Sequence, residues 1–169
     1  YIVTDDIYVM PNDTLTIEPG VVIKIDGDKS IGIKGSLRAI GTNDNYIRFT
    51  KNSSTNWDEI KFDTTDDSSF FDYCIIEFGT DGIKINGSSF SYAPKVRILN
   101  SYISNNSGFG IWTYYNYSGV YVRNTVINNN GDGIYVNWCF NGVSIENSTI
   151  VDNSGYGFKC NTSAFSIIN

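Results

Sequence analysis

The sequence predicts an all-β solenoid, in which short strands coil around one continuous core. Three observations lead to this prediction. One phrase recurs four times: an apolar strand with a polar Asn or Asp, a second Ile-bearing strand, an Asn/Ser turn, and a Gly that opens a third strand. The phrase returns at a period of roughly 20–30 residues, which is typical of solenoids. The chain is rich in Tyr, Ile, Asn, Ser, Thr and Gly and has only 3 Pro, a composition that favours strands and tight turns.

The polar residue of the phrase marks equivalent positions in successive coils. These positions are Asp72, Asn100, Asn124, Asn147 and Asn169, with unequal spacings that place the insertions in loops. An Asn side chain can hydrogen-bond to its equivalents above and below, and it tolerates a left-handed bend between two strands. We therefore expect a structural ladder at Asp72, Asn100, Asn124 and Asn147, with Asn147 buried.

Within each repeat, side chains should alternate between core and surface. The third strand is predicted to direct one set inward (Ile111, Ile134 and Phe158) and the next set outward (Trp112, Tyr135 and Lys159). The glycine before that strand is predicted to supply a second bend (Gly82, Gly110, Gly133 and Gly157).

We expect the 169 residues to form one domain of about six or seven coils. Residues 1–62 would form N-terminal coils with a compatible phrase of their own, and residues 70–169 would form the asparagine-ladder repeats. The chain begins with Tyr1 rather than Met, and Ile167-Ile168-Asn169 looks like the start of another copy. These features predict a part of a longer solenoid.

Composition excludes several functions. The net charge is −6 and the 12 Lys and Arg are dispersed, so we expect neither a nucleic-acid partner nor an anionic membrane surface. No apolar run is long enough to cross a membrane. The chain has no His, which removes Ser-His and Cys-His nucleophile pairs and the commonest zinc sites. No cofactor or metal site is expected.

The three cysteines, Cys74, Cys139 and Cys160, lack the spacing of a metal site. Cys160 falls where the other copies have Ile85, Thr113 and Val136, so it is predicted to be a small inward residue. The alternative is a disulfide between Cys139 and Cys160 across adjacent turns.

A family resemblance becomes specific in the first coils. The stretches that carry it are Leu15 to Ile25, Gly35 to Thr42, Ile47 to Thr50 and Trp57 to Ile60. They resemble the opening of right-handed parallel β-helix surface proteins of archaea and bacteria. The later Asn-rich copies resemble the repeat shared by pectate lyases and adhesin-like proteins. The resemblance covers nearly the whole chain and implies a single-stranded right-handed parallel β-helix. It leaves function open, because this fold carries both enzymes and inert surface modules.

Six Asn-x-Ser/Thr sequons are candidate glycosylation sites, since their Asn residues are expected in loops or turns (Asn12, Asn52, Asn86, Asn105, Asn116 and Asn161). Glycosylation would place the chain outside the cell or on its surface. Asn147 also begins a sequon and is assigned to the ladder instead.

Carboxylates are the weak candidates for catalysis. Glycosidases on β-helices that resemble this one use two or three acids on an outward face, and Asp63, Asp66 and Asp67 cluster in one loop. Turn formation explains the same residues, and Ca²⁺ bound at this loop is a further alternative. A lyase would add a basic residue such as Arg97 or Arg123. Glu146 could follow Arg123 in the same column and form an ordinary ion pair with it.

Aromatic residues are the most suggestive surface feature. Trp112 and Tyr135 are expected to stack outward in adjacent coils, with Tyr114 and Trp138 nearby. Such a surface can bind sugar rings, although stacking that only stabilises the sheet is the alternative. The sequence thus predicts a non-catalytic extracellular structural or adhesive surface module. Its partners would be glycans, cell-envelope polymers or copies of itself, and the alternative is a polysaccharide lyase or glycosidase.

Overall fold

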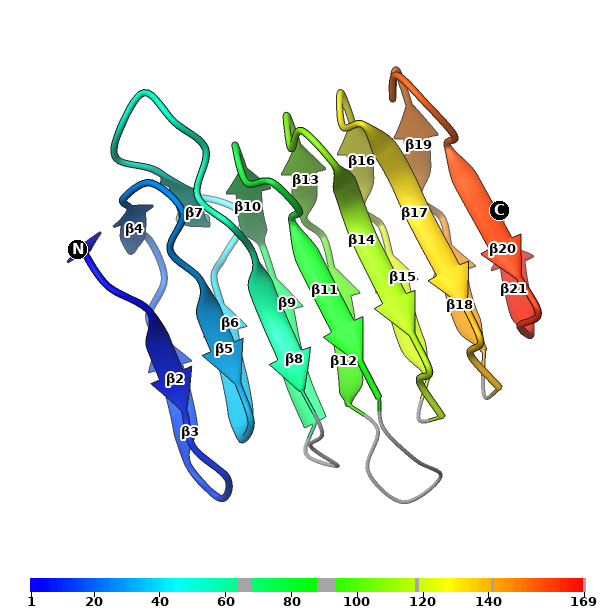
Figure 1. Ribbon diagram of the computed structural model, residues 1–169, viewed down its shortest axis with the longest axis horizontal. Helices are drawn as coiled ribbons and strands as arrows, with labels where there is room; N and C mark the ends of the chain where they lie inside the picture. Colours follow the sequence, from blue (N-terminus) through cyan, green and yellow to red (C-terminus); the bar gives the residue numbers. More distant parts are fainter. Residues whose placement is uncertain (64–67, 88–93, 118, 141, 169) are drawn as a thin grey trace.

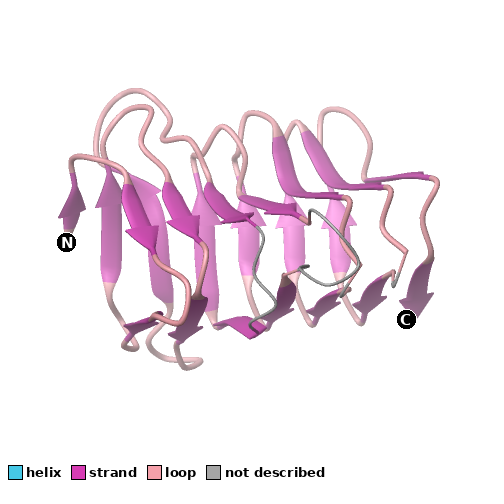
Figure 2. Cartoon of the chain, turned by 60° about the horizontal axis from the view of Figure 1, so that its bottom comes forward, coloured by secondary structure: helices cyan, strands magenta, loops and turns pink. Residues whose placement is uncertain are grey.

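The computed structural model describes residues 1–63, 68–87, 94–117, 119–140 and 142–168. In this part of the chain all regular elements are strands, and they form a parallel β-solenoid (Figures 1 and 2). Each coil contributes one strand to each of three parallel sheets. The predicted all-β solenoid of six or seven coils is therefore confirmed.

The three sheets, which we name A, B and C, contain seven strands each. Sheet A contains β1 (Ile2–Val3), β4 (Val22–Ile25), β7 (Ile47–Lys51), β10 (Cys74–Glu77), β13 (Tyr102–Ser104), β16 (Val126–Asn128) and β19 (Thr149–Val151). Sheet B contains β2 (Ile7–Val9), β5 (Ile31–Ile33), β8 (Ile60–Asp63), β11 (Ile83–Asn86), β14 (Phe109–Tyr114), β17 (Asp132–Asn137) and β20 (Phe158–Asn161). Sheet C contains β3 (Thr14–Ile17), β6 (Ser36–Ile40), β9 (Ser68–Asp72), β12 (Lys95–Leu99), β15 (Val120–Arg123), β18 (Val143–Glu146) and β21 (Phe165–Ile168).

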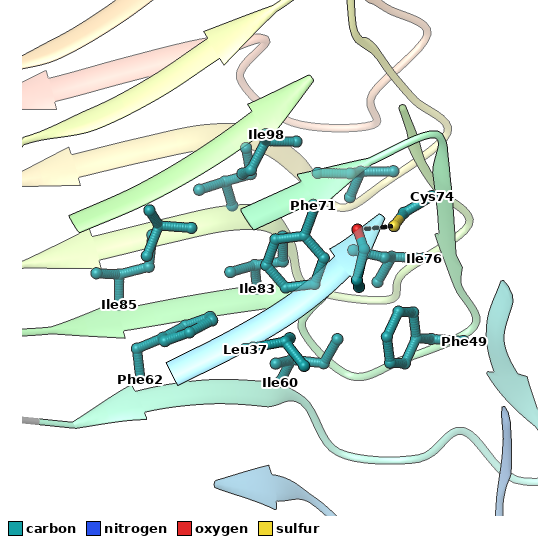
Figure 3. Close-up of a cluster of buried hydrophobic side chains, with 14 of the residues drawn as sticks. Leu37, Phe49, Ile60, Phe62, Phe71, Cys74, Ile76, Ile83, Ile85 and Ile98 are labelled. Atoms are coloured by element: carbon teal, nitrogen blue, oxygen red, sulfur yellow. Dashed lines mark hydrogen bonds between the residues drawn. The ribbon is translucent and has the colours of Figure 1, made fainter. Parts of the chain in front are cut away.

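One apolar core runs between the three sheets, because alternate residues of every strand point inward. Figure 3 shows side chains from several strands converging there, including Phe49, Phe62 and Phe71. Phe71 packs edge-on against both of the other rings, with centroid separations of 6.2 and 6.0 Å. Ile111 and Ile134 are fully buried, as predicted, and Phe158 is half-buried against the same core.

The cysteines belong to this core region. Cys160 pairs in register with Val136 on the neighbouring strand, as the repeat predicts. All three cysteines are free, so the alternative of a Cys139–Cys160 disulfide is wrong. The Cys74 thiol donates to the Ala39 carbonyl at 3.4 Å, and burial raises the pKa of this thiol to about 12.

The predicted asparagine ladder lies at the bend from sheet C to sheet A. Asn100, Asn124 and Asn147 have φ of 47°, 50° and 46°, in the left-handed region. The amide of Asn124 donates to Asn100 at 3.1 Å, and Asn100 donates to Asp72 at 2.8 Å. The residue with the left-handed backbone in the Asp72 coil is Tyr73, so Asp72 lies one position before the bend. Asn147 is exposed, and the expectation of burial is wrong because this bend faces solvent.

A second ladder, which the sequence analysis did not identify, lies at the bend from sheet A to sheet B. It consists of Asn106, Asn130 and Asn153, the first two of which are buried. The Asn106 amide donates to Asn130 Oδ1 at 2.8 Å, and the Asn130 amide donates to Asn153 Oδ1 at 3.0 Å. Backbone N–H groups of Asn106 and Asn130 donate to the same acceptors. Buried polar groups at this bend are thereby satisfied from coil to coil.

The repeated glycines do not act as predicted. The backbones of Gly82, Gly110 and Gly133 do not have positive φ, so these residues do not form left-handed bends. Instead, a Cβ on any of them would lie 2.3–2.7 Å from the carbonyl oxygen of the next glycine in the stack. Glycine is needed here because the backbones of adjacent coils approach closely.

Candidate carbohydrate-binding surface

The outer face of sheet B carries the first group of predicted aromatic residues. Trp112 on β14 pairs in register with Lys84 on β11 and with Tyr135 on β17. The Phe109 ring lies 5.4 Å from both aromatic rings and is stacked on Tyr135. The Lys84 ammonium lies 4.5 Å from the centre of the Trp112 ring. Trp112 and Tyr135 thus belong to one stack, joined through Phe109 and flanked by Lys84.

Packing restricts what Trp112 can offer to a ligand. The side chain is half-buried, and its indole Nε1 is buried without a hydrogen-bond partner among the described residues. Buried donors without partners are uncommon in proteins. Within this stack, Trp112 contributes to the packing of the sheet face more than to an accessible platform.

A second group of rings lies where sheet B turns toward sheet C. We call this group the aromatic ridge: Tyr114, Tyr115, Tyr117, Trp138 and Phe140. Tyr115 stacks on Trp138 with an interplanar angle of 8°, and Tyr117 stacks on Phe140 with an angle of 10°. Tyr114 packs edge-on against Tyr115 at 4.7 Å. The structure therefore unites Tyr114 and Trp138 in the ridge and separates them from the stack of Trp112 and Tyr135.

The ridge exposes large apolar surfaces. The exposed fractions are 37% for Tyr114, 40% for Trp138 and 45% for Phe140. The stacked pairs come from adjacent coils, since Tyr114 pairs in register with Asn137. Exposed aromatic side chains in a contiguous group are typical of interaction surfaces.

Of the three acids predicted as weak catalytic candidates, the structure describes only Asp63. Asp63 pairs with Lys61 at 3.0 Å, and its other carboxylate oxygen accepts a hydrogen bond from the Asn86 amide at 3.1 Å. These contacts explain Asp63 as a link between two coils. Asp66 and Asp67 lie outside the described residues, as does most of the loop considered for Ca²⁺. Within the described ranges, no three acidic or cysteine side chains gather in a metal-binding arrangement.

A different acid has the more unusual environment. Glu59, just before β8, is 6% exposed and pairs with Lys84 at 3.3 Å. Burial raises the pKa of Glu59, although the nearby Lys84 opposes this effect. Asp81 is also buried with a raised pKa, but its Oδ1 accepts the Phe109 N–H at 2.8 Å, which gives it a role at the bend. Sequence reasoning missed Glu59 because it assigned the Trp57 to Ile60 stretch to the fold only.

The basic residues on sheet C also differ from expectation. Arg123 and Glu146 are neighbours in register, as anticipated, but no ion pair joins them within the described residues. Instead, the Glu146 carboxylate accepts hydrogen bonds from Tyr121 Oη at 2.6 Å and from Ser144 Oγ at 3.3 Å. Neutral hydroxyl groups therefore satisfy Glu146.

The sequons divide by accessibility. Asn12, Asn52, Asn105 and Asn161 are exposed, and Asn86 is half-buried with its amide on Asp63. Asn116 is fully buried, and its amide donates to the Pro94 carbonyl at 3.0 Å. A glycan on Asn116 would break this hydrogen bond and open the coil, so Asn116 is removed from the glycosylation candidates.

Comparisons with known proteins agree with this architecture. The family model described as "Right handed beta helix region" matches residues 2–169. No curated protein and no solved structure matches the chain. Among the described residues, no helix is long and apolar enough to cross a membrane. The match extends over all three sheets and agrees with the resemblance to right-handed parallel β-helix repeats. The chain therefore belongs to the right-handed β-helix family.

Proposed function

We propose that this chain is a non-catalytic surface module, working outside the cell, that binds glycans through the aromatic ridge. The observation that carries the proposal is the exposure of stacked rings at adjacent coils, with Trp138 and Phe140 the most exposed of the ridge. Sugar rings bind to aromatic faces through their apolar C–H surfaces, while their hydroxyl groups bond to nearby polar groups.

Polar side chains beside the ridge support a sugar ligand. Tyr114 pairs in register with Asn86 and Asn137, and Asn137 pairs with Asn161, whose amide donates to Tyr135 Oη at 2.9 Å. Amide groups both donate and accept hydrogen bonds. A row of amides next to aromatic rings suits the hydroxyl groups of a carbohydrate.

The experiment compares two tryptophan variants on a panel of neutral oligosaccharides. Trp138→Ala removes an exposed ring and should weaken binding by about tenfold, or about 1.4 kcal/mol, with little change in melting temperature. Trp112→Ala removes a packed ring and should lower the melting temperature more than it weakens binding. Equal affinity of Trp138→Ala and the parent chain for every ligand, or the absence of any ligand, would refute the proposal.

A second candidate function, a carbohydrate-active enzyme of the glycosidase or lyase type, has one specific observation in its favour. Glu59 is a buried carboxylate with a raised pKa beside Lys84, and strongly perturbed groups gather at active sites. A hollow near it is lined by Tyr8, Asp58 and Lys61 among others. This candidate predicts that Glu59→Gln abolishes a cleavage activity of the parent chain.

A further inference from the structure

The outer face of sheet C contains a hollow of about 630 Å³ with an unusual set of charges. Its lining includes Lys95 and Arg97 from β12 and Arg123 from β15, and no carboxylate is found among the lining residues that the structure describes. All three cationic side chains are exposed, and none of them forms an ion pair with another described residue. In a chain of net charge −6, this is a local concentration of positively charged side chains.

The two arginines lie diagonally across neighbouring strands. Arg97 pairs in register with Tyr121, and Arg123 lies two residues further along the same strand. From the spacing of strands and the rise per residue, their Cα atoms are about 8 Å apart. The Arg97 guanidinium lies 5.8 Å from the Phe70 ring centre, and Arg38 lies 5.4 Å from the same ring. Stacking on Phe70 holds the Arg97 side chain over the sheet.

Glu146 and Asp72, two described acids on the same sheet, form no ion pair with the arginines. Glu146 accepts hydrogen bonds from Tyr121 and Ser144. Asp72 accepts the amide of Asn100. Both carboxylates are therefore occupied by neutral donors, and neither is within ion-pair distance of Arg97 or Arg123.

Two glycines lie at one side of the hollow. Gly119 and Gly142 line it, with φ of 84° and 82°. Residues with a side chain rarely adopt this backbone conformation, so glycine suits the bend at both positions. The hydroxyl groups of Ser68, Tyr121 and Ser144 line the remaining wall. The lining thus extends across four successive strands of the sheet: β9, β12, β15 and β18.

We propose that this hollow binds the acidic groups of a polysaccharide, carboxylates of uronic acids or sulfate esters. Arginine guanidinium groups bind such anions with paired, planar hydrogen bonds. The hydroxyl groups that line the hollow can hydrogen-bond to sugar hydroxyls. Because the hollow extends over several coils, it fits a polymer better than a single ion. A nucleic acid fits less well, because the rest of the chain is acidic and phosphate backbones need longer basic surfaces. The site lies on a different sheet from the Trp112 stack and does not depend on the aromatic ridge.

The experiment measures binding of the full chain by isothermal titration calorimetry at low and high ionic strength. The probes are alginate oligosaccharides and the same oligosaccharides with their carboxyl groups reduced to alcohols. Dextran sulfate and unmodified dextran form a second pair, which separates sulfate from carboxylate recognition. The double variant Arg97→Gln/Arg123→Gln is compared with Lys24→Gln/Lys51→Gln, which loses the same charge on sheet A.

The proposal predicts that at least one acidic polymer binds and that its neutral counterpart does not. The arginine variant should bind it at least about tenfold more weakly, with an unchanged melting temperature, while the lysine variant stays within about twofold of the parent chain. Equal losses in both variants would indicate non-specific charge attraction and overturn the proposal. So would absence of binding, or tighter binding of a single-stranded oligonucleotide than of either acidic polymer. The Trp138→Ala variant, which tests the ridge, should retain the acidic ligand, so the two sites can fail independently.

Discussion

The coils before residue 87 and those after residue 94 hold together by different means. All four ion pairs among the described residues lie in the first region, including Arg48–Glu77 and Lys84–Glu59. The first region also buries the largest side chains, Trp57, Phe49, Phe62 and Phe71. In the second region, repeated amide and hydroxyl groups connect the coils, and the buried core consists mainly of Ile and Val.

This difference coincides with the positions of the two proposed binding surfaces. In the first region, four ion pairs and a core with large rings contribute to the packing of the coils. In the second region, ladders of small polar residues connect the bends of adjacent coils. The aromatic ridge and the cationic hollow both lie chiefly there. Repetition at the bends therefore leaves the faces of the sheets free to carry function.

The largest expected effect comes from placing a charge in the core of the second region. Ile134→Asp would bury a carboxylate at a fully buried position with no partner, which is among the most destabilising substitutions known. We expect loss of the cooperative thermal transition in circular dichroism. Thr149→Asp, at an exposed position of β19, should melt near the parent temperature. A cooperative melt of Ile134→Asp at that temperature would contradict the register.

The two ladders should differ in strength. Asn130→Ala removes four hydrogen bonds at a buried bend. The Asn130 side chain accepts two of them, from the Asn106 amide and the Asn106 backbone N–H, and donates the other two. We expect a loss of about 2–4 kcal/mol in the free energy of unfolding, measured by urea denaturation. Asn124→Gly, at the exposed ladder, keeps the left-handed backbone accessible and should cost less than about 1 kcal/mol. Equal losses would show that burial does not distinguish the ladders.

A smaller, pH-dependent effect should mark the first region. Because burial raises the pKa of Glu59, the folded chain holds this proton more tightly than the unfolded chain. Its contribution to stability is therefore present at low pH and is lost as pH rises from about 4.3, the ordinary glutamate value, through the raised pKa. Glu59→Gln should thus gain stability relative to the parent chain as pH rises, in urea titrations at several pH values. Glu18→Gln controls for loss of an exposed negative charge, and a pH-independent difference would contradict the burial effect.

The sequence predicts the fold well because a strand phrase repeated with Ile and Asn determines inward positions, parallel stacking and one bend. The period alone aligns Ile111 with Ile134. The ladder at Asn106, Asn130 and Asn153 was detectable, since these residues are 24 and 23 positions apart and each is followed within two residues by Gly. It was not predicted because these residues fall in the Asn/Ser turn of the phrase, where turn formation alone accounts for them.

The candidate sites were less predictable for physical reasons. Glu59 is unusual because it is buried and because Lys84, 25 residues later, lies beside it on the next coil. Trp112 and Trp138 lie in different groups because the Trp112 ring packs against Lys84, whereas the Trp138 ring extends from the bend after β17. Likewise, the availability of Arg123 depends on Tyr121 and Ser144 donating to Glu146. Such choices among competing partners are not contained in a repeat pattern.

The central claim, binding without catalysis, can be tested most directly by following a bound polysaccharide over time. The parent chain is incubated with each polysaccharide that it binds, and new reducing ends and unsaturated sugar products are measured, with Glu59→Gln in parallel. The account predicts stable binding with no product from either protein. Product formation by the parent chain that disappears in Glu59→Gln would contradict it and establish the enzyme instead.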